Sequence, residues 1–469
     1  MNPGDVRGGP PAVQVLVAGA AAVLALALVI SSGTLDPYAL ALVSLAALAA
    51  LTAAGINLRS PPGERSRLAV AALGAGIAGS LVLNLLFLPG ITVNPARLGA
   101  FRPGVALTAL VLASYLWRGA PAWVVRARFP VLLLLGAGLG AVVMRASPAP
   151  AIDVWQIQQH GAAGLLAGYN PYRLRYPNVY GSGTPFLDPS LVSADGRFVL
   201  AYPYAPATLL LDLPSAWLGD VRWTMLAAVV AAAWLVRRLG RGSIEAELAG
   251  ALLLLQPQTF LVLELSWTEP VALATTLLAV AAVDRTAGGG AAEAKGAAAW
   301  LWPGLAGALA AASKQYLPLL LLPLLFALPA RARLRAAAVA IVGGLAIYLP
   351  FLLLDPAALF RGVVLFQIRQ PFRPDALSWT AALVSAGGPL LPSWPAFLLS
   401  GAVLVLSLRR TVSTAQAVIA GATAWTFLVL FSKQAFCNYY WLSVGLLCAA
   451  AALLLRAAPA AQEAPAPRR

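Results

Sequence analysis

Charged residues are scarce in this chain. They make up 10% of its 469 residues, whereas hydrophobic types make up 60%, and the mean hydropathy is +0.81. Soluble globular domains carry roughly 25% charged residues. The composition therefore excludes a soluble globular protein and predicts an all-α polytopic membrane protein.

Cysteine, histidine and lysine are also rare. Cys437 and Cys448 are the only cysteines, and both lie in or beside the last apolar run, so neither a disulfide framework nor a zinc site is expected. His160 is the only histidine. The lysines are Lys295, Lys314 and Lys433. We expect no metal and no cofactor.

The net charge of +15 does not indicate a nucleic-acid partner. The basic residues sit mostly in short connections between apolar runs, where positive charge fixes membrane topology. No basic stripe is interleaved with stacking aromatic residues, as nucleic-acid binding would require. Membrane lipid is the expected surrounding of this chain.

A spanning helix needs about 20 apolar residues, and that rule predicts about 14 transmembrane helices. Their ranges are 12–32, 37–56, 68–90, 103–117, 129–145, 221–236, 244–262, 270–284, 297–313, 316–330, 334–354, 394–408, 414–431 and 441–456. Arginine-rich connections alternate along this order, which predicts cytoplasmic termini and an outward-facing loop 146–201. The apolar segments 203–218 and 377–391 break the alternation, so we expect them to be re-entrant or interfacial.

Three regions are expected along the chain. Residues 1–128 form an N-terminal scaffold of four transmembrane helices without ionisable residues in their interiors, and residues 129–456 form the functional membrane domain. Residues 457–469 are Ala, Pro and charged residues only, apart from one Gln, and predict a disordered cytoplasmic tail.

The loop 146–201 is predicted to begin with an amphipathic helix from about Ile152 to Ala167. Gly168 can supply a left-handed cap, and Pro171 bars continuation of the helix. At about 100° per residue, Asp153, Gln156 and His160 share one face. Such a helix lies at the membrane surface with its carboxylate turned away from lipid.

Four charged residues stand at the predicted outer ends of spans: Glu264, Glu269, Lys314 and Lys433. A charge inside the bilayer is unfavourable by at least about 2.5 kcal/mol, so its position carries information. Two alternatives stay open. The lysines could extend to the outer headgroups, and Asp153 could serve only as a favourable charge near a helix start.

Three short motifs accompany these charges: Gly168-Tyr169-Asn170-Pro171-Tyr172, Tyr202-Pro203-Tyr204-Ala205-Pro206 and Ser313-Lys314-Gln315. Together with an aspartate soon after a spanning helix, they resemble the GT-C superfamily of membrane glycosyltransferases. The greatest similarity is to glycosyltransferase family 87, the polyprenyl-phosphate-sugar-dependent mannosyltransferase type, over roughly Val131 to Leu455.

The resemblance implies an inverting hexosyltransferase of the bacterial plasma membrane, with its active site on the extracytoplasmic side. It would move a sugar, most commonly mannose, from a polyprenyl-phosphate donor to a glycan or glycolipid acceptor of the cell envelope. The resemblance assigns Asp153 as the general base and Lys314 to the donor phosphate, and Lys433 and Arg369 are further candidates for that phosphate. The expected substrate-binding residues are Gln156, His160, Tyr172, Tyr202, Tyr204, Glu264, Glu269, Gln315, Gln434 and Asn438. For His160, a hydrogen-bonded structural role is the alternative.

Two other functions fit the same pattern. Broken helices with intramembrane charge are also features of transporters, so the chain could move a polyprenyl-linked glycan across the membrane. A lipid-linked glycan polymerase or ligase would share the chemistry and transfer an oligosaccharide.

Overall fold

The computed structural model describes residues 10–56, 65–181, 191–193, 195–197, 202–288, 298–409, 411 and 413–456. Regular structure in these residues is helical, apart from two isolated β-bridges, Thr34 with Ala376 and Pro177 with Arg197. The all-α class is therefore confirmed. The expected tail 457–469 lies outside the described residues.

Within the residues that the structure describes, seven helices are long and apolar enough to cross a membrane. They are α1 (Pro11–Ser31), α2 (Pro37–Gly55), α3 (Arg67–Leu86), α5 (Ala122–Ala146), α11 (Glu269–Gly288), α14 (Ala330–Leu354) and α20 (Cys437–Leu455). Local sequence explains several of their starts. Asp36, for example, accepts hydrogen bonds from the backbone of Tyr38 and Ala39 and so caps α2 ahead of Pro37.

Two further pairs of helices are long enough only when joined. Helices α7 (Pro206–Trp217) and α8 (Arg222–Leu239) meet at 114°, and α9 (Ile244–Leu255) and α10 (Pro257–Glu264) meet at 48°. Counting each pair as one span gives up to nine crossings by length and composition in the described part of the chain, whereas 14 were expected. Pro257 explains the second bend, because proline cannot donate the backbone hydrogen bond that continues a helix.

Other expected spans are short helices. They are α4 (Phe101–Ala113, extended by the 3-10 turn η2, Ser114–Leu116), α12 (Ala298–Ser313), α13 (Leu317–Ala327), α18 (Trp394–Leu408) and α19 (Thr414–Leu430). The 11 residues of α13 cover about 17 Å, roughly half the hydrocarbon thickness. The 12 residues of α7 and the seven of α17 (Trp379–Ser385) are likewise too few for a crossing on their own. This agrees with the interfacial or re-entrant character expected for 203–218 and 377–391.

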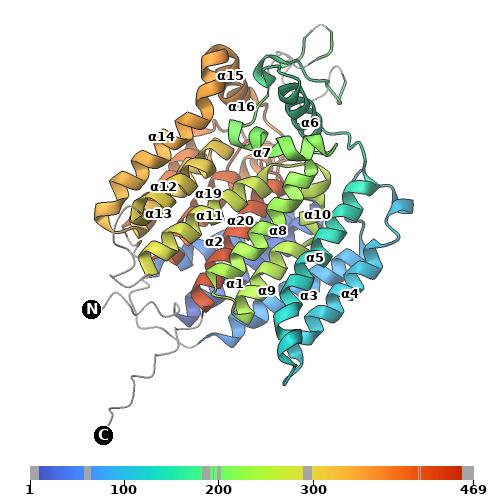
Figure 1. Ribbon diagram of the computed structural model, residues 1–469, viewed down its shortest axis with the longest axis vertical. Coiled ribbons are helices and arrows are strands. Elements are labelled where there is room, and N and C mark those ends of the chain that lie inside the picture. The colour runs from blue at the N-terminus through green and yellow to red at the C-terminus, as the bar shows by residue number, and fades with distance from the viewer. Residues whose placement is uncertain are drawn as a thin grey trace.

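Several short elements gather at one end of the molecule, called here the α6 end. They are α6 (Asp153–Leu166), η3 (Pro171–Arg173), α15 (Pro356–Phe360), the π-helix η5 (Arg361–Leu365) and α16 (Phe366–Arg369). Figure 1 shows α6, α15 and α16 together at the top of the helical bundle. The remaining element, η1 (Pro95–Arg97), lies between α3 and α4.

Among the described residues, the two largest hydrophobic cores differ in kind. The larger core runs through the helical bundle and includes residues of α1, α5, α9, α11 and α20. The second core lies at the α6 end and is rich in tyrosine. Its buried members are Ile157, Ala162, Tyr172, Tyr176, Tyr202, Leu209, Val221, Phe351, Ala358, Leu359 and Val363.

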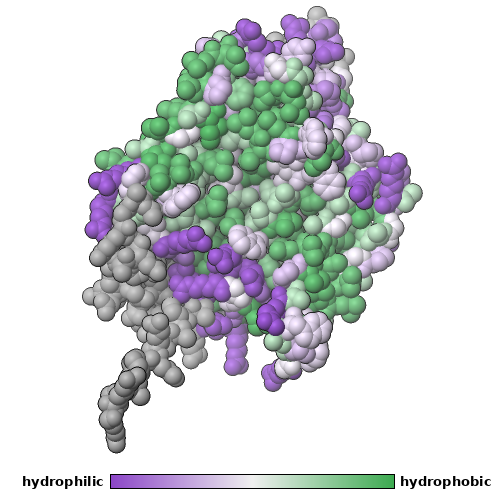
Figure 2. Space-filling model, in the orientation of Figure 1, coloured by the Kyte–Doolittle hydropathy of each residue, from purple (hydrophilic) through white to green (hydrophobic). Residues whose placement is uncertain are grey.

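Hydrophobic side chains also cover much of the outside of the bundle. Helix α14 is the clearest case, since only 11% of its most apolar window is buried and Leu345, Leu349 and Leu353 are exposed. Figure 2 shows apolar residues across the middle of one face and hydrophilic residues gathered toward its ends. A surface of this kind is suited to contact with lipid.

The N-terminal helices share the larger core with the rest of the bundle, which is continuous across residue 128. Asn84 of α3 donates to the carbonyl of Leu255 at 2.7 Å, and Gln258 of α10 donates to that of Leu28 in α1 at 2.8 Å. Gly33 lies against Cys437 so closely that a side chain at 33 would overlap it. The first four helices are therefore packed into the same body as the helices that follow them.

Candidate functional site

The expected amphipathic helix is present at the α6 end. Helix α6 begins at Asp153 and ends at Leu166, within one residue of the predicted limits at both ends. Gly168 follows with a φ of +84°, a conformation that glycine adopts without a steric penalty. The cap and the proline that follows it explain why sequence alone located this element.

Asp153 stands at the first residue of α6, partly buried. Its Oδ1 accepts hydrogen bonds from the hydroxyl of Tyr180 at 2.9 Å and from the backbone N–H of Val154 at 2.8 Å. Burial raises the pKa of Asp153, while these two hydrogen bonds and the guanidinium of Arg373 act in the opposite direction. Carboxyl groups with a raised pKa are candidates for functional sites, although structural contacts also shift pKa values.

Glu269 and Lys314 form a buried ion pair, although neither lies in the loop that carries Asp153. Glu269 opens α11, and Lys314 lies between α12 and α13. The hydroxyl of Tyr316 donates to the same carboxylate oxygen at 3.1 Å. The lysine charge is therefore already neutralised by a neighbouring side chain.

Both carboxylates affect the Tyr204 phenol. Burial raises its pKa, and the negative charges of Asp153 and of Glu269 raise it further. A hydrogen bond joins the two regions, because Gln158 of α6 donates to the carbonyl of Ser266, three residues before Glu269, at 2.6 Å.

Aromatic rings line the neighbourhood of the ion pair. Tyr316 stacks on Trp425 with ring centroids 4.1 Å apart, and Trp425 meets Tyr439 edge-on at 6.0 Å. The ammonium of Lys314 lies 5.3 Å from the Tyr316 ring centroid and 5.9 Å from that of Tyr439. Such rings can stack against a sugar, and here they also stabilise the lysine charge.

Lys433 and Gln434 hold the segment that follows α16. The ammonium of Lys433 donates to the carbonyl of Ile368 at 3.0 Å and also to that of Gln370. Gln434 donates to the side chain of Gln370 at 3.1 Å and to the carbonyl of Pro371 at 3.0 Å. Among the described residues, no carboxylate lies within ion-pair distance of Lys433, so its positive charge stays uncompensated.

Arg369 and Arg373 lie in the segment that Lys433 holds. Arg369 is exposed, and the structure brings it into no contact with the carboxylates near Tyr204. Arg373 pairs with Asp375 at 2.7 Å, and its positive charge lowers the pKa of Asp153. The sequence analysis assigned no role to Arg373.

Tyr172 and Tyr202 are buried in the second core. The Tyr172 hydroxyl donates to the carbonyl of Tyr204 at 2.8 Å, which fixes the backbone of that residue. Tyr202 is fully buried between Gly161 of α6 and Gly362 of η5, and a side chain at either glycine would overlap it. Both tyrosines therefore contact Tyr204, Tyr172 through the hydrogen bond and Tyr202 through its ring at 5.3 Å between centroids.

Three more of the expected substrate-binding residues have other contacts. Gln315 donates to the carbonyls of Pro203 at 3.2 Å and Val363 at 3.3 Å, which joins the two sides of the second core. The exposed His160 contacts the carbonyl of Gln156 through Nδ1 at 2.8 Å, as expected for a structural histidine. Asn438 is buried in the first turn of α20.

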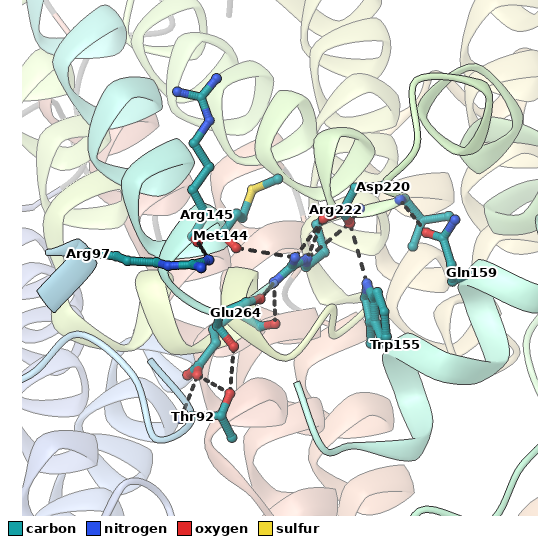
Figure 3. A network of polar contacts seen from close by, with 11 residues as sticks. Thr92, Arg97, Met144, Arg145, Trp155, Gln159, Asp220, Arg222 and Glu264 are labelled. Atoms are coloured by element: carbon teal, nitrogen blue, oxygen red, sulfur yellow. Dashed lines mark hydrogen bonds and ion pairs between the residues drawn. The ribbon is translucent and has the colours of Figure 1, made fainter. Parts of the chain in front are cut away.

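Glu264 lies at the end of α10, and its carboxylate is occupied by the loop that follows α3. It accepts from the backbone N–H groups of Ile91 at 2.8 Å and Thr92 at 2.6 Å, and also from the Thr92 hydroxyl (Figure 3). A buried carboxylate needs such donors to offset its lost hydration. Glu264 therefore holds the loop after the N-terminal helix α3 against the bundle.

A second polar group in Figure 3 was missed by sequence reasoning. Arg222, at the start of α8, is bound by Asp220 through two nitrogens and donates to the carbonyl of Ser147 at 2.8 Å. The same guanidinium reaches the carbonyls of Met144 and Glu264 at 3.3 Å each. The charge of Arg222 at the edge of an apolar run, the criterion that selected Lys314, would have found it.

The Asp220–Arg222 pair also anchors α6. Trp155 donates from its indole N–H to Asp220 at 3.4 Å, and Gln159 accepts from the backbone N–H of Val221 at 3.0 Å. Both residues lie on the helix that begins with Asp153. Residues at the ends of α5, α8 and α10 thus hold α6, the helix that begins with Asp153, in place.

Comparison of this chain with protein-family models, with curated proteins and with solved structures finds no match.

Proposed function

We propose that this chain is an inverting glycosyltransferase that moves a sugar, with mannose as the first candidate, from a polyprenyl-phosphate donor to a glycan or glycolipid acceptor. The reaction would take place on the extracytoplasmic face of a bacterial plasma membrane, at the α6 end. One observation carries the proposal: the amphipathic helix that begins with Asp153 is hydrogen-bonded through Gln158 to the carbonyl of Ser266, three residues before Glu269 and its buried partner Lys314.

In this proposal Asp153 takes the proton of the acceptor hydroxyl as that oxygen attacks the anomeric carbon. Its raised pKa favours the transfer, because a base is most effective when its pKa approaches the working pH. Tyr180 and Arg373 oppose the effect of burial, because both stabilise the charged carboxylate and lower its pKa. The polyprenyl phosphate departs with the glycosidic electron pair and needs charge stabilisation more than an acid.

The uncompensated charge of Lys433 makes it the better candidate for the donor phosphate. Two of its three N–H donors hold carbonyls, and one remains for a ligand oxygen. Arg369 is exposed in the same segment and could approach the phosphate from the solvent side. Lys314 already forms an ion pair with Glu269, so its role in this proposal is to hold that carboxylate beside the sugar.

The broken helix pairs keep a transporter of polyprenyl-linked glycans as the second candidate, because helix breaks are used for binding in transporters. Purified protein in lipid nanodiscs separates the two functions. With polyprenyl-phosphate mannose labelled in the sugar and a mixture of envelope acceptors, we expect label in a product that no longer carries prenyl phosphate. Movement of intact labelled donor between the leaflets of a proteoliposome, without transfer, would instead identify a transporter.

A further inference from the structure

The break between α10 and α11 holds a group of buried polar atoms without partners. Within the described part of the chain, the side-chain oxygens of Ser266 and Thr268, Oε1 of Gln158 and Oε2 of Glu269 have no hydrogen-bond partner. All four residues are at most 2% exposed. Buried polar groups are hydrogen-bonded in the great majority of cases, so several unpaired groups in one segment require an explanation.

The backbone at this break ends α10 in a left-handed cap. Ser266 has a φ of +58°, its N–H donates to the carbonyl of Leu263 at 3.2 Å, and the N–H of Trp267 donates to that of Val262 at 3.1 Å. Gln158 of α6 holds this cap, because its amide N–H donates to the Ser266 carbonyl at 2.6 Å.

Thr268 provides a third observation. It directly precedes α11, where a threonine ordinarily caps the helix with its side-chain oxygen. Its hydroxyl makes no such bond. The hydroxyl is therefore free beside the Glu269–Lys314 pair, on the same turn of chain.

The four free atoms define the chemistry of the missing partner. Gln158 Oε1 and Glu269 Oε2 can only accept hydrogen bonds, while the hydroxyls of Ser266 and Thr268 can donate or accept. The partner must therefore supply several O–H or N–H donors. Glu269 is already neutralised by Lys314, so a cation would add an uncompensated buried charge, and an anion would be repelled by the carboxylate.

We propose that Gln158, Ser266, Thr268 and Glu269 form a subsite for the hydroxyl groups of a sugar. The identification of this sugar as that of the lipid donor rests on the proposed function. The site is closed in this structure, and one or more waters can fill it until a sugar displaces them.

Binding measured with full-length protein in nanodiscs tests the subsite. The probes are a short-chain prenyl-phosphate mannose and the same prenyl phosphate without the sugar. Wild-type protein should bind the mannose-bearing probe more tightly. Thr268→Val and Ser266→Ala should each weaken that probe about 3- to 10-fold and leave the sugar-free probe unchanged, as expected for the loss of one hydrogen bond.

Thr276→Val is the matched control. Thr276 lies on the same helix and is buried, but its hydroxyl already donates to the carbonyl of Ala272 at 2.7 Å. This variant should keep the preference for the sugar-bearing probe. Thr268→Val should also be at least as stable as wild type without ligand, because it removes an unpaired buried hydroxyl. An unchanged sugar preference in Thr268→Val would overturn the subsite.

Two further arms separate this inference from the proposed function. If wild-type protein binds neither prenyl probe, binding of methyl mannoside and a panel of other methyl hexosides is measured instead. Glycoside binding that is lost in Thr268→Val supports the sugar subsite and contradicts only the proposed donor. Absence of any glycoside binding overturns the subsite. The last measurement compares thermal stability in sodium chloride and in choline chloride. If sodium stabilises the wild type but not Thr268→Val, and no glycoside binds, the subsite binds a cation and the proposal is overturned.

Discussion

The hydroxyl of Tyr180 donates to the carboxylate of Asp153 at 2.9 Å, so a residue of the loop that follows α6 covers the first residue of that helix. Burial and this hydrogen bond act on the pKa of Asp153 in opposite directions. The balance between them determines both the reactivity of the carboxylate and the stability of its ionised form.

Asp153→Asn should remove nearly all sugar transfer. The amide keeps the shape of the side chain but cannot take up a proton, and a positioned base contributes about 10² to 10⁴-fold in rate. Turnover with labelled donor measures the loss, and donor affinity should stay close to that of wild type. Transfer at the wild-type rate would remove Asp153 from the mechanism.

The stability of the same variant separates a base from a favourable helix charge. A carboxyl whose pKa is raised on folding stabilises the folded protein below its unfolded pKa, and that contribution is lost as the pH rises through the folded value. Asp153→Asn should therefore be as stable as wild type or more stable at pH 8, with the difference shrinking as the pH falls. A helix-charge role predicts the reverse, a loss of up to about 1 kcal/mol at pH 8.

Tyr180→Phe should move the pH dependence of transfer. The Tyr180 hydrogen bond lowers the pKa of Asp153, so its removal leaves burial less opposed and raises that pKa further. The acid limb of kcat/KM against pH should shift to higher pH, and activity above that limb should largely remain. A profile with unchanged limbs and a uniformly lower rate would give Tyr180 a purely structural role.

Lys314→Met and Lys433→Met should differ in their effects on stability and on donor binding. Lys314→Met leaves Glu269 buried without its ion pair, and such losses destabilise by about 3–5 kcal/mol. Lys433→Met removes hydrogen bonds to two carbonyls, with a smaller expected loss of about 1–2 kcal/mol, and should weaken donor binding. Chemical denaturation and binding of prenyl phosphate measure the two effects.

A double variant provides the control for this comparison. Glu269→Gln in the Lys314→Met background removes the buried charge and should recover much of the lost stability. Equal destabilisation by the two single variants, or no recovery in the double variant, would contradict the assignment of Lys314 to Glu269.

Gly90→Ala should loosen the attachment of the N-terminal helices. A side chain at Gly90 would overlap the Glu264 carboxylate, which holds the backbone of Ile91 and Thr92. We expect a destabilisation of about 1–3 kcal/mol in thermal unfolding, as for other overpacked sites. Gly99→Ala is the control, because no atom lies within 4 Å of its added side chain.

The orientation of the α6 end can be measured with introduced cysteines. Cys437 and Cys448 are fully buried, so the natural thiols should contribute little background. An impermeant thiol reagent added to intact cells should label Tyr169→Cys, near the end of α6, and leave Arg238→Cys, at the opposite end of α8, unlabelled. Labelling of both positions from one side would contradict the predicted topology.

Sequence alone determined the class of the protein and its local elements. The scarcity of charge predicted membrane helices because each unpaired charge in lipid is unfavourable. The limits of α6 followed from Gly168 and Pro171, which act through their own backbone geometry. The number of crossings could not be predicted from composition. The bends at Pro257 and after α7 divide apolar runs into shorter helices, and composition does not distinguish a bent run from a straight one.

Only the tertiary structure decided which of the polar residues belong together. Glu264 and Glu269 are five residues apart and similar in sequence, yet one holds the loop after α3 and the other pairs with Lys314. Lys314 and Lys433 each stand in the middle of a Ser-Lys-Gln triplet, yet only Lys314 has a carboxylate partner among the described residues. Partners of this kind depend on which helices pack together, and that is settled by the whole apolar surface of the bundle, not by the residues next to each charge.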